Sequence, residues 1–553
     1  MSYLDRYDAT PDADKFKVAR TWLDNPTDAL GFCNEMREKR PIIKTDVCTF
    51  VADMNDVIEV LRVFDVFTVE PYKAKMSPYL MSEDDTAKHF RDKSLMSAFL
   101  DRNDLNGASP NSVRKQIGNA TKAALDAAKG QIDVVYQLTR GIPLSLVDSY
   151  MGLKNAPDGA LRRWSYWNQY DAFHNHPWDI MSDDMRKTVS TNVAQAKSEM
   201  KDYLGKLIQD KMTERLKGLI PGVKLSMPAD TIVDRVLNAA FEDTSFHMGT
   251  FQDLNPKDAI LKSNVIPTSS INTAEMLALC QATQSPPPFG PLWMGLNFGG
   301  LLIGTVETTS QLTAQALAVL LRGDPQILKS AQIAATYDDP ATFDGYVWEA
   351  ARFWPLSPYL FRLCEGDYTL GAGRPWQTTI VKGTAVLPLV QAAMNDPVRF
   401  PNPDKFDPTR PWRQNTFHFG YGLHECMGRY VGEMLVPEII RQILLRTDIK
   451  VVSDITTGFL YAASLMGVTG VQSVSAAAPA LVDRSRPFSQ VPIAVGLGVS
   501  TADQAAEIAA YADGVIVGSA FVRRLLDAAT PEQGVREVGE LAARLAQGVR
   551  EAR

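Results

Sequence analysis

Several features that mark specialised proteins are scarce in this chain of 553 residues. It has only five cysteines, and because none form a CxxC pair, neither a disulfide framework nor a zinc site is indicated. The N-terminal segment contains no apolar run long enough for a signal peptide or a membrane span. A formal net charge of -7 provides no basic stripe for phosphates. We therefore expect a cytoplasmic protein with no membrane span and no nucleic-acid partner.

The last hundred residues lack four residue types altogether. After residue 452 there is no lysine, histidine, cysteine or tryptophan, and alanine, valine and glycine become frequent. Short apolar runs there alternate with Gly-rich turns and amphipathic helical patterns, which is typical of parallel α/β architecture. The change predicts two domains, residues 1–452 and residues 453–553.

The first domain is predicted to be mainly α. Apolar residues recur at three-to-four spacing over residues 112–140, 192–220 and 270–283, which indicates amphipathic helices. Strand-like runs are few and short, and they gather between residues 377 and 390. We expect a helical body beside a small β subdomain.

One cysteine has unusual neighbours. Cys426 lies in "TFHFGYGLHECMGRY", where glycines flank it and an apolar helical pattern follows directly. A free cysteine is usually inert core filling. Glycines, however, let a second group approach the backbone closely, and the amides of a helix N-terminus favour a thiolate. Cys426 is thus a candidate soft anionic ligand or nucleophile.

The same loop resembles a known family. Phe419, Gly422, Cys426 and Gly428 match the pattern F-x-x-G-x-x-x-C-x-G of cytochrome P-450 enzymes. The resemblance implies the cytochrome P-450 fold for the first domain. It also implies that Cys426 is the axial ligand to the iron of haem b (iron protoporphyrin IX), with the other three residues shaping the cofactor-binding loop.

Three charged residues match the family in the expected order. Glu349 and Arg352 form an E-x-x-R pair, which on its own would be read as a surface ion pair between helical neighbours. Arg410 then matches the arginine that completes a buried Glu-Arg-Arg network in the family. The resemblance implies a structural role for this network, on the thiolate side of the haem.

An apolar pattern around residue 304 resembles the long helix that crosses the oxygen-binding face in the family. Gly304, Glu307 and Thr308 match its [AG]-G-x-[DE]-T motif, although Thr305 replaces the second glycine. An acid can supply protons and a hydroxyl can hold the water that delivers them, so Glu307 and Thr308 are the candidate catalytic residues. The alternative is an ordinary helix with back-bonded threonines and a solvated glutamate.

Haem propionates need cationic or imidazole partners. His424 and Arg362 occupy positions where the family places such contacts, and His89 is a further candidate on an earlier predicted helix. The family has an arginine four residues after this histidine, and the residue at that position here is Lys93. Arg91 does not match, because it follows His89 by only two residues.

The resemblance implies a haem-thiolate monooxygenase that uses dioxygen and oxidises a small apolar substrate. No flavin, ferredoxin or nicotinamide signature is found, so a separate ferredoxin or flavodoxin-type donor is expected, docking near Arg429. Two alternatives stay open. One is a haem-thiolate hydroperoxide isomerase or peroxygenase that needs no reductase. The other is a haem-binding protein whose catalysis is impaired.

The second domain resembles the last third of the tryptophan synthase alpha subunit, a (β/α)8 barrel. The matching stretches are "GFLYAASLMGVTG", "PIAVGLGVSTADQAAEIAAYADGVIVGSAFV" and "EVGELAARLAQGVREA". The family's catalytic carboxylates lie on earlier strands, so no indole-forming lyase activity is expected. A few strands cannot close a barrel, and exposed edges favour packing or self-association. The segment occupies the position where cytochrome P-450 enzymes have a β-hairpin that caps the substrate pocket. We therefore expect a fusion of parts of two proteins.

Overall fold

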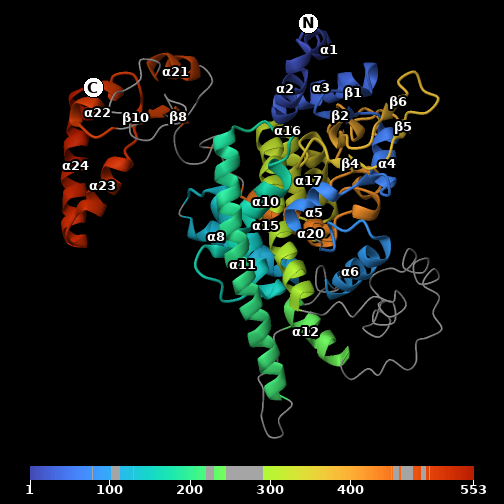
Figure 1. The fold of residues 1–553 in the computed structure, drawn as a ribbon, viewed down its shortest axis with the longest axis horizontal. Coiled ribbons are helices and arrows are strands. Elements are labelled where there is room, and N and C mark those ends of the chain that lie inside the picture. The colour runs from blue at the N-terminus through green and yellow to red at the C-terminus, as the bar shows by residue number, and fades with distance from the viewer. Residues whose placement is uncertain are drawn as a thin grey trace. The chain divides into compact units, whose positions relative to one another are not determined.

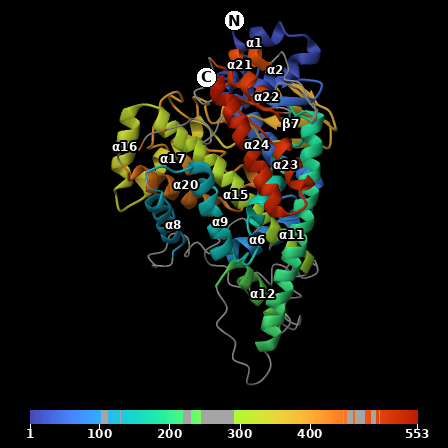
Figure 2. The same ribbon diagram turned by 90° about the vertical axis from the view of Figure 1, so that its left-hand side faces the viewer.

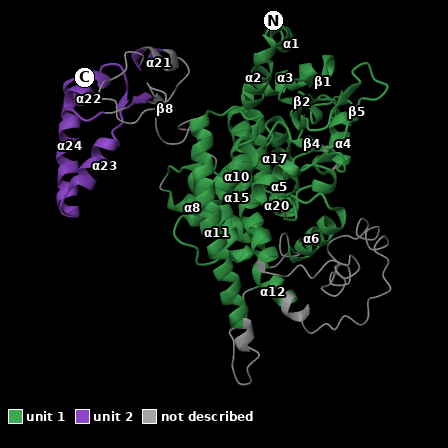
Figure 3. Cartoon of the chain, in the orientation of Figure 1, with its two compact units in different colours: residues 1–449 green, residues 450–553 purple. Residues whose placement is uncertain are grey.

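The structure is a computed structural model, and it describes twelve stretches of the chain. They are residues 1–77, 79–100, 112–128, 130–218, 230–243, 291–446, 448–449, 451, 460–462, 478–486, 493–496 and 499–552. The chain folds into two compact units, Met1–Ile449 and Lys450–Arg553 (Figure 3). This division lies close to the predicted boundary, which itself falls on residues outside the described stretches, as does the helix predicted over 270–283.

Unit 1 is mainly helical (Figure 1). Its α-helices are α1 (Tyr3–Asp8), α2 (Asp12–Asp24), α3 (Pro26–Lys39), α4 (Met54–Arg62), α5 (Glu70–Met76), α6 (Thr86–Phe99), α8 (Val113–Ala127), α9 (Gly141–Leu146), α10 (Ala160–His174), α11 (Asp183–Gly218), α12 (Ile232–Asp243), α15 (Pro291–Arg322), α16 (Pro325–Ala335), α17 (Ala341–Phe353), α18 (Val390–Ala393), α19 (Trp412–Asn415) and α20 (Arg429–Leu444). Short π-helical segments cover Val134–Thr139 and Val147–Met151, and a 3-10 turn covers Gly422–His424.

Two small sheets complete unit 1. The larger has the strand order β1-β2-β7-β4-β3, and the smaller pairs β5 with β6. Only β2 and β7 run parallel, with Cys48 opposite Ala385. The strands are β1 (Ile42–Lys44), β2 (Cys48–Val51), β3 (Phe67–Thr68), β4 (Arg362–Cys364), β5 (Tyr368–Leu370), β6 (Thr378–Ile380) and β7 (Ala385–Pro388). The predicted small β subdomain is therefore present.

Helix α15 runs through the middle of unit 1 and positions the candidate site. It packs against α10, α11, α17 and α20, and Figures 1 and 2 show it beside the long helix α11. Its buried side chains, including Phe298, Leu302 and Val306, recur at three-to-four spacing and join the largest apolar core. The face that is not buried in this core remains available for a binding site.

The helix predicted over residues 112–140 is interrupted. Helix α8 ends at Ala127, and Gly130 has a φ of +95°, which glycine adopts without strain. Asp133 then caps the segment Val134–Thr139 by accepting a hydrogen bond from the amide of Tyr136. The apolar periodicity indicates helical structure on both sides of Gly130. Because the pattern itself continues across the turn, it does not mark where α8 ends.

Unit 2 is a parallel α/β segment, as predicted. Its described strands, in the order β10-β9-β8, are β8 (Leu460–Ala462), β9 (Ile493–Val495) and β10 (Gly514–Val515). Its helices are α21 (Ala478–Ser485), α22 (Ala502–Ala509), α23 (Ser519–Asp527) and α24 (Pro531–Glu551), with α24 packed on α22 and α23. Among the described residues, no helix of either unit has the length and apolar character needed to cross a membrane.

Candidate functional site

The loop of residues 416–428 before α20, called the cysteine loop below, holds Cys426 in a fixed backbone conformation. The Cys426 amide donates to the carbonyl of Phe419 over 2.8 Å. Gly420 and Gly422 have φ values of +75° and +74°, and a Cβ on Gly422 would lie 3.0 Å from the Leu61 carbonyl oxygen. Both glycines are thus required by the backbone. The loop delivers the thiol to the N-terminal end of α20, as the sequence predicts.

The thiol of Cys426 is reachable by solvent, yet protein surrounds it. The residue is exposed, whereas Cys33, Cys48 and Cys364 are buried. Desolvation nevertheless raises the pKa of Cys426, while a hydrogen bond from the Gly428 amide and the charge of Lys93 act in the opposite direction. Cys426 is thus an exposed residue whose thiol is desolvated by the surrounding protein. Such a position suits a ligand to a group bound there.

Phe419 packs under this loop. Its ring lies 5.3 Å from the ring of Trp348, centroid to centroid, on α17. A Cβ on Gly432 of α20 would lie 2.8 Å from the same ring, so only glycine permits this contact without a shift. Phe419 therefore ties the loop to α17 and α20.

Helix α15 presents a small open face at Gly304 and Thr308. Gly304 is exposed, and no heavy atom lies within 4 Å of the position of a Cβ there. The hydroxyl of Thr308 donates to the Gly304 carbonyl over 2.5 Å, a bond that leaves lone pairs on the hydroxyl for another donor. These two residues lie one turn apart and line the same side of the helix.

Glu307 is buried and engaged with a partner that the sequence did not indicate. Its Oε2 accepts from Nε and Nη2 of Arg140, both over 2.8 Å, while its Oε1 has no partner among the described residues. Burial raises the pKa of Glu307, and Arg140 opposes this shift. Glu307 is therefore buried and ion-paired, unlike a solvated surface acid.

Arg362 on β4 is a buried cation. The residue is 4% exposed, its Nη1 donates to its neighbour's carbonyl, and its Nε has no partner among the described residues. Burial lowers the pKa of Arg362, while the charges of Tyr72 and Asp84 act in the opposite direction. A buried guanidinium without a direct ion-pair partner is costly, so an anion bound beside it would relieve the penalty.

His424 lies in the same region but already has an acidic partner. Its Nε2 bonds Oδ1 of Asp84 over 2.9 Å, and the Nδ1 atom is buried without a partner in the described part of the chain. Burial lowers the pKa of His424, whereas the Asp84 hydrogen bond raises it. One ring nitrogen thus remains available for another polar group.

His89 and Lys93, on α6, both contact the cysteine loop. Nε2 of His89 donates to the carbonyl of Leu423 over 2.9 Å, and Lys93 Nζ donates to the same oxygen over 2.8 Å. Lys93 also donates to the carbonyl of Glu425 over 2.5 Å. Burial lowers the pKa of His89 to about 3, so its imidazole is neutral. Both side chains therefore form hydrogen bonds with the backbone of the cysteine loop.

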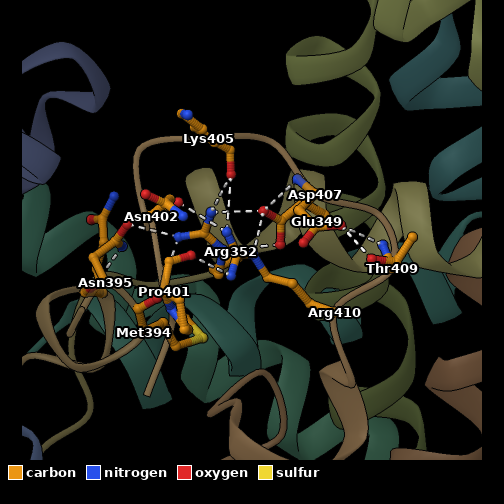
Figure 4. A network of polar contacts seen from close by, with 11 residues as sticks. Glu349, Arg352, Met394, Asn395, Pro401, Asn402, Lys405, Asp407, Thr409 and Arg410 are labelled. Atoms are coloured by element: carbon orange, nitrogen blue, oxygen red, sulfur yellow. Dashed lines mark hydrogen bonds and ion pairs between the residues drawn. The ribbon is translucent and has the colours of Figure 1, made fainter. Parts of the chain in front are cut away.

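The predicted charged network comes together between α17 and the segment before the cysteine loop (Figure 4). Arg352 donates two hydrogen bonds to Glu349, from Nε to Oε2 over 3.0 Å and from Nη2 to Oε1 over 2.7 Å. Arg410 Nε reaches Glu349 Oε1 over 3.1 Å, and the Asp407 amide donates to the same oxygen over 3.1 Å. Arg352 is 1% exposed and also bonds Asn395.

Four residues of this region could not be identified as site residues from the sequence. Asp84 and Arg140 pair with predicted site residues that lie 340 and 167 positions away in the chain, and no local pattern marks such pairs. Lys93 stands out in the sequence only as a departure from the family. The ring of Tyr79 lies 2.6 Å from a Cβ position on Gly300 of α15, and burial, with a smaller contribution from the charge of Cys426, raises the pKa of Tyr79. Only the three-dimensional arrangement reveals these four.

Comparison with known proteins agrees with this geometry. Residues 342–459 match the family model "Cytochrome P450", a stretch that contains Glu349, Arg352, Arg410 and the cysteine loop. Residues 439–550 match "Tryptophan synthase alpha chain". The chain joins a cytochrome P450 fold to a segment similar to the tryptophan synthase alpha chain. The P450 match supports a haem-thiolate monooxygenase in general.

Solved P450 structures share the fold of unit 1. The ligand-free cytochrome P450 TbtJ1 aligns with a TM-score of 0.53 and 19% identity, covering 76% of this chain and 90% of that chain. Cytochrome P450 CYP109Q5 from Chondromyces apiculatus aligns with a TM-score of 0.51 and 18% identity, covering 78% and 89%. At this level of identity the likeness concerns the fold.

Curated relatives match the tail. The tryptophan synthase alpha chain of Streptomyces coelicolor is 58% identical over 100 residues, which are 18% of this chain and 37% of that protein. The protein of Mycobacteroides abscessus is 62% identical over 96 residues, which are 17% of this chain and 34% of that protein. The chain thus spans little more than a third of the length of these relatives.

Proposed function

We propose that unit 1 is a monooxygenase in which Cys426 ligates the iron of haem b. The observation that carries the proposal is the accessible but desolvated thiol of Cys426 at the start of α20. The open face of α15 at Gly304 and the buried Arg362, whose Nε has no partner among the described residues, fit the same cofactor, because a haem needs a flat space and a cation for its propionates. When bound, thiolate-ligated haem supplies activation of dioxygen for attack on C–H bonds.

In this proposal Arg362 and His424 receive the propionates. Arg362 offers a buried guanidinium with an Nε that no described residue bonds, and His424 offers its buried Nδ1. Asp84 holds the other nitrogen of His424 and so keeps the ring oriented. His89 supports the loop through its Nε2, which bonds the Leu423 carbonyl, and its buried Nδ1 has no partner among the described residues, so it stays a candidate for the propionates as well.

Thr308 and Glu307 have unequal parts in proton transfer. Thr308 is placed to hold a water on the open face of α15, since its hydroxyl still has acceptor capacity. Glu307 can join the relay only when its ion pair with Arg140 opens, because its charge is buried and held there. Delivery of protons therefore depends on Arg140 as well as on the two predicted residues.

Substrate and electrons come from outside the chain in this proposal. The substrate is a small apolar molecule, and a separate ferredoxin or flavodoxin-type protein supplies electrons. Arg429, where docking was expected, already pairs with Glu425 and Glu433. A docking protein would have to compete with these carboxylates, so Arg429 alone is a weak anchor.

Replacement of Thr308 tests the proposal. In Thr308→Ala, electron consumption should continue while product per electron falls roughly 100-fold, the loss typical of removing a general acid–base group. The matched control is Thr309→Ala, because Thr309 is buried and does not lie on the open face. Full coupling of electrons to product in Thr308→Ala would contradict the assignment.

The ion pair of Glu307 favours a second candidate, a haem-thiolate peroxygenase. With the acid held by Arg140, a reaction that takes oxygen from a hydroperoxide would not require Glu307 to deliver protons. Turnover with a hydroperoxide, and none with dioxygen and an electron donor, would select this candidate. Haem loading without either activity would instead indicate a binding protein.

For unit 2 we propose self-association without lyase activity. Helix α23 exposes Val522, Leu525 and Leu526, which are 53%, 50% and 78% exposed. An apolar stripe of this kind is stabilised by contact with a second copy. Leu526→Glu should shift the full chain toward the monomer in analytical ultracentrifugation. An unchanged oligomeric state would remove this proposal, and release of indole from indole-glycerol phosphate would contradict the absence of lyase activity.

A further inference from the structure

Lys93 occupies an unusual position for a cation on α6. Its ammonium donates to two backbone oxygens of the cysteine loop, those of Leu423 and Glu425, which lie on the N-terminal side of Cys426. Among the described residues, no carboxylate lies within ion-pair distance of this ammonium. Its positive charge is therefore directed at backbone dipoles, and hydrogen bonds from a charged donor are stronger than those between neutral groups.

The charges of Lys93 and Cys426 also act on each other. Desolvation lowers the pKa of Lys93 to about 8, while Cys426 and Glu425 act in the opposite direction. The influence is mutual, because Lys93 lowers the pKa of Cys426 against its desolvation. Hydrogen bonds and charge thus both connect this side chain to the loop that presents the thiol.

His89 supports the same loop from one turn earlier on α6. It donates to the Leu423 carbonyl, so two side chains of one helix hold a single oxygen. An imidazole that is neutral cannot replace the charge of the lysine. The two contacts therefore differ in kind, and only one brings a positive charge beside Cys426.

We propose that Lys93 is a positioning residue for the cysteine loop. It holds the carbonyl oxygens of Leu423 and Glu425 and so fixes Cys426, and it does not bind a haem propionate. Its role in ligation rests on the proposed haem function. Its role in ordering the loop does not. The two parts can therefore be tested separately.

The first test uses the haem-free full chain. In Lys93→Met, backbone amides of residues 423–428 should exchange with deuterium roughly 10-fold faster or more, because a charged hydrogen bond to the loop is lost. Lys93→Arg should restore most of the protection, since its guanidinium can donate to both carbonyls. Lys206→Met is the matched control, because Lys206 is an exposed lysine that pairs with Asp210 in its own helix. Unchanged exchange in Lys93→Met would overturn the proposal.

The second test separates the loop from the propionates. Wild type and Lys93→Met are titrated with protohaem and with its dimethyl ester, in which both propionates are neutral, and the thiolate-ligated fraction is measured by absorption. The proposal expects the same several-fold loss of affinity with both cofactors. A loss that disappears with the dimethyl ester would show a propionate contact and overturn the proposal. If wild type binds neither cofactor, the proposed haem function fails, and hydrogen exchange alone decides the role of Lys93.

Discussion

The two units differ in how completely they bury their apolar helix faces. In unit 1, α17 and α20 are largely buried, and even charged Glu349 and Arg352 lie in the interior with partners. In unit 2, α23 is fully described and none of its residues is buried, although its sequence is strongly amphipathic. An amphipathic sequence is enough to specify a helix, whereas burial of its apolar face requires the rest of the fold.

The difference agrees with how much of each fold is present. The P450 structures are covered to about nine tenths of their length, whereas the tryptophan synthase relatives are covered to little more than a third. Unit 2 still has its own small core, an apolar cluster that includes Leu541 and Leu545 of α24 as well as Ile493 and Val495 of β9. The parallel strands described in unit 2, β8, β9 and β10, cannot close a barrel by themselves. We therefore expect the two units to respond very differently to equivalent substitutions.

The largest effect is expected in the buried network of unit 1. Arg352→Met should destabilise the unit by about 3–5 kcal/mol, because it leaves Glu349 charged and buried without its main partner. Calorimetry of the full chain should show a much lower transition for this unit. In the exposed control Lys206→Met, loss of the pair with Asp210 should cost less than about 1 kcal/mol. Equal costs would mean that the network does not stabilise the unit.

A pair of leucines makes the comparison within unit 2. Leu541→Ala should cost about 2–5 kcal/mol, since Leu541 is 3% exposed in the small core. Leu526→Ala should change stability by less than about 0.5 kcal/mol, since Leu526 is 78% exposed. Hydrogen exchange of the amides of α22 and β9 would measure both effects. A large cost for Leu526→Ala would show that α23 is covered in solution.

A smaller effect is expected from the pH dependence of Asp344. This residue of α17 bonds Arg114 of α8 over 2.9 Å, with Glu438 and Arg413 also acting on it. Burial raises the pKa of Asp344 to about 6 from an ordinary value of 3.8. The native state then binds the proton more tightly than the unfolded chain, so this group favours folding below about pH 4 and loses that contribution as the pH rises through 6.

Asp344→Asn isolates this contribution. The free energy of unfolding of wild type should fall relative to that of the variant, by up to about 3 kcal/mol, as the pH is raised from about 4 to 7. Urea titrations of unit 1 at several pH values would measure the difference. Parallel curves for the two proteins would show that Asp344 titrates in its ordinary range.

Much of unit 1 could be predicted because its key signals are local or resemble a family in sequence order. Gly420 and Gly422 marked a loop that needs positive φ, and the three-residue spacing of Glu349 and Arg352 puts them on one helical face. The contacts between Glu307 and Arg140 and between His424 and Asp84 could not be predicted, because they join residues 167 and 340 positions apart. The predicted helix over 112–140 was too long, because periodicity continues across the turn at Gly130.

The role of Cys426 as an iron ligand is tested most directly by the absorption spectrum of the reduced, haem-loaded full chain under carbon monoxide. We predict the Soret band of thiolate-ligated haem in wild type and its complete loss in Cys426→Ala. Absence of that band in wild type, or its persistence in Cys426→Ala, would contradict the assignment.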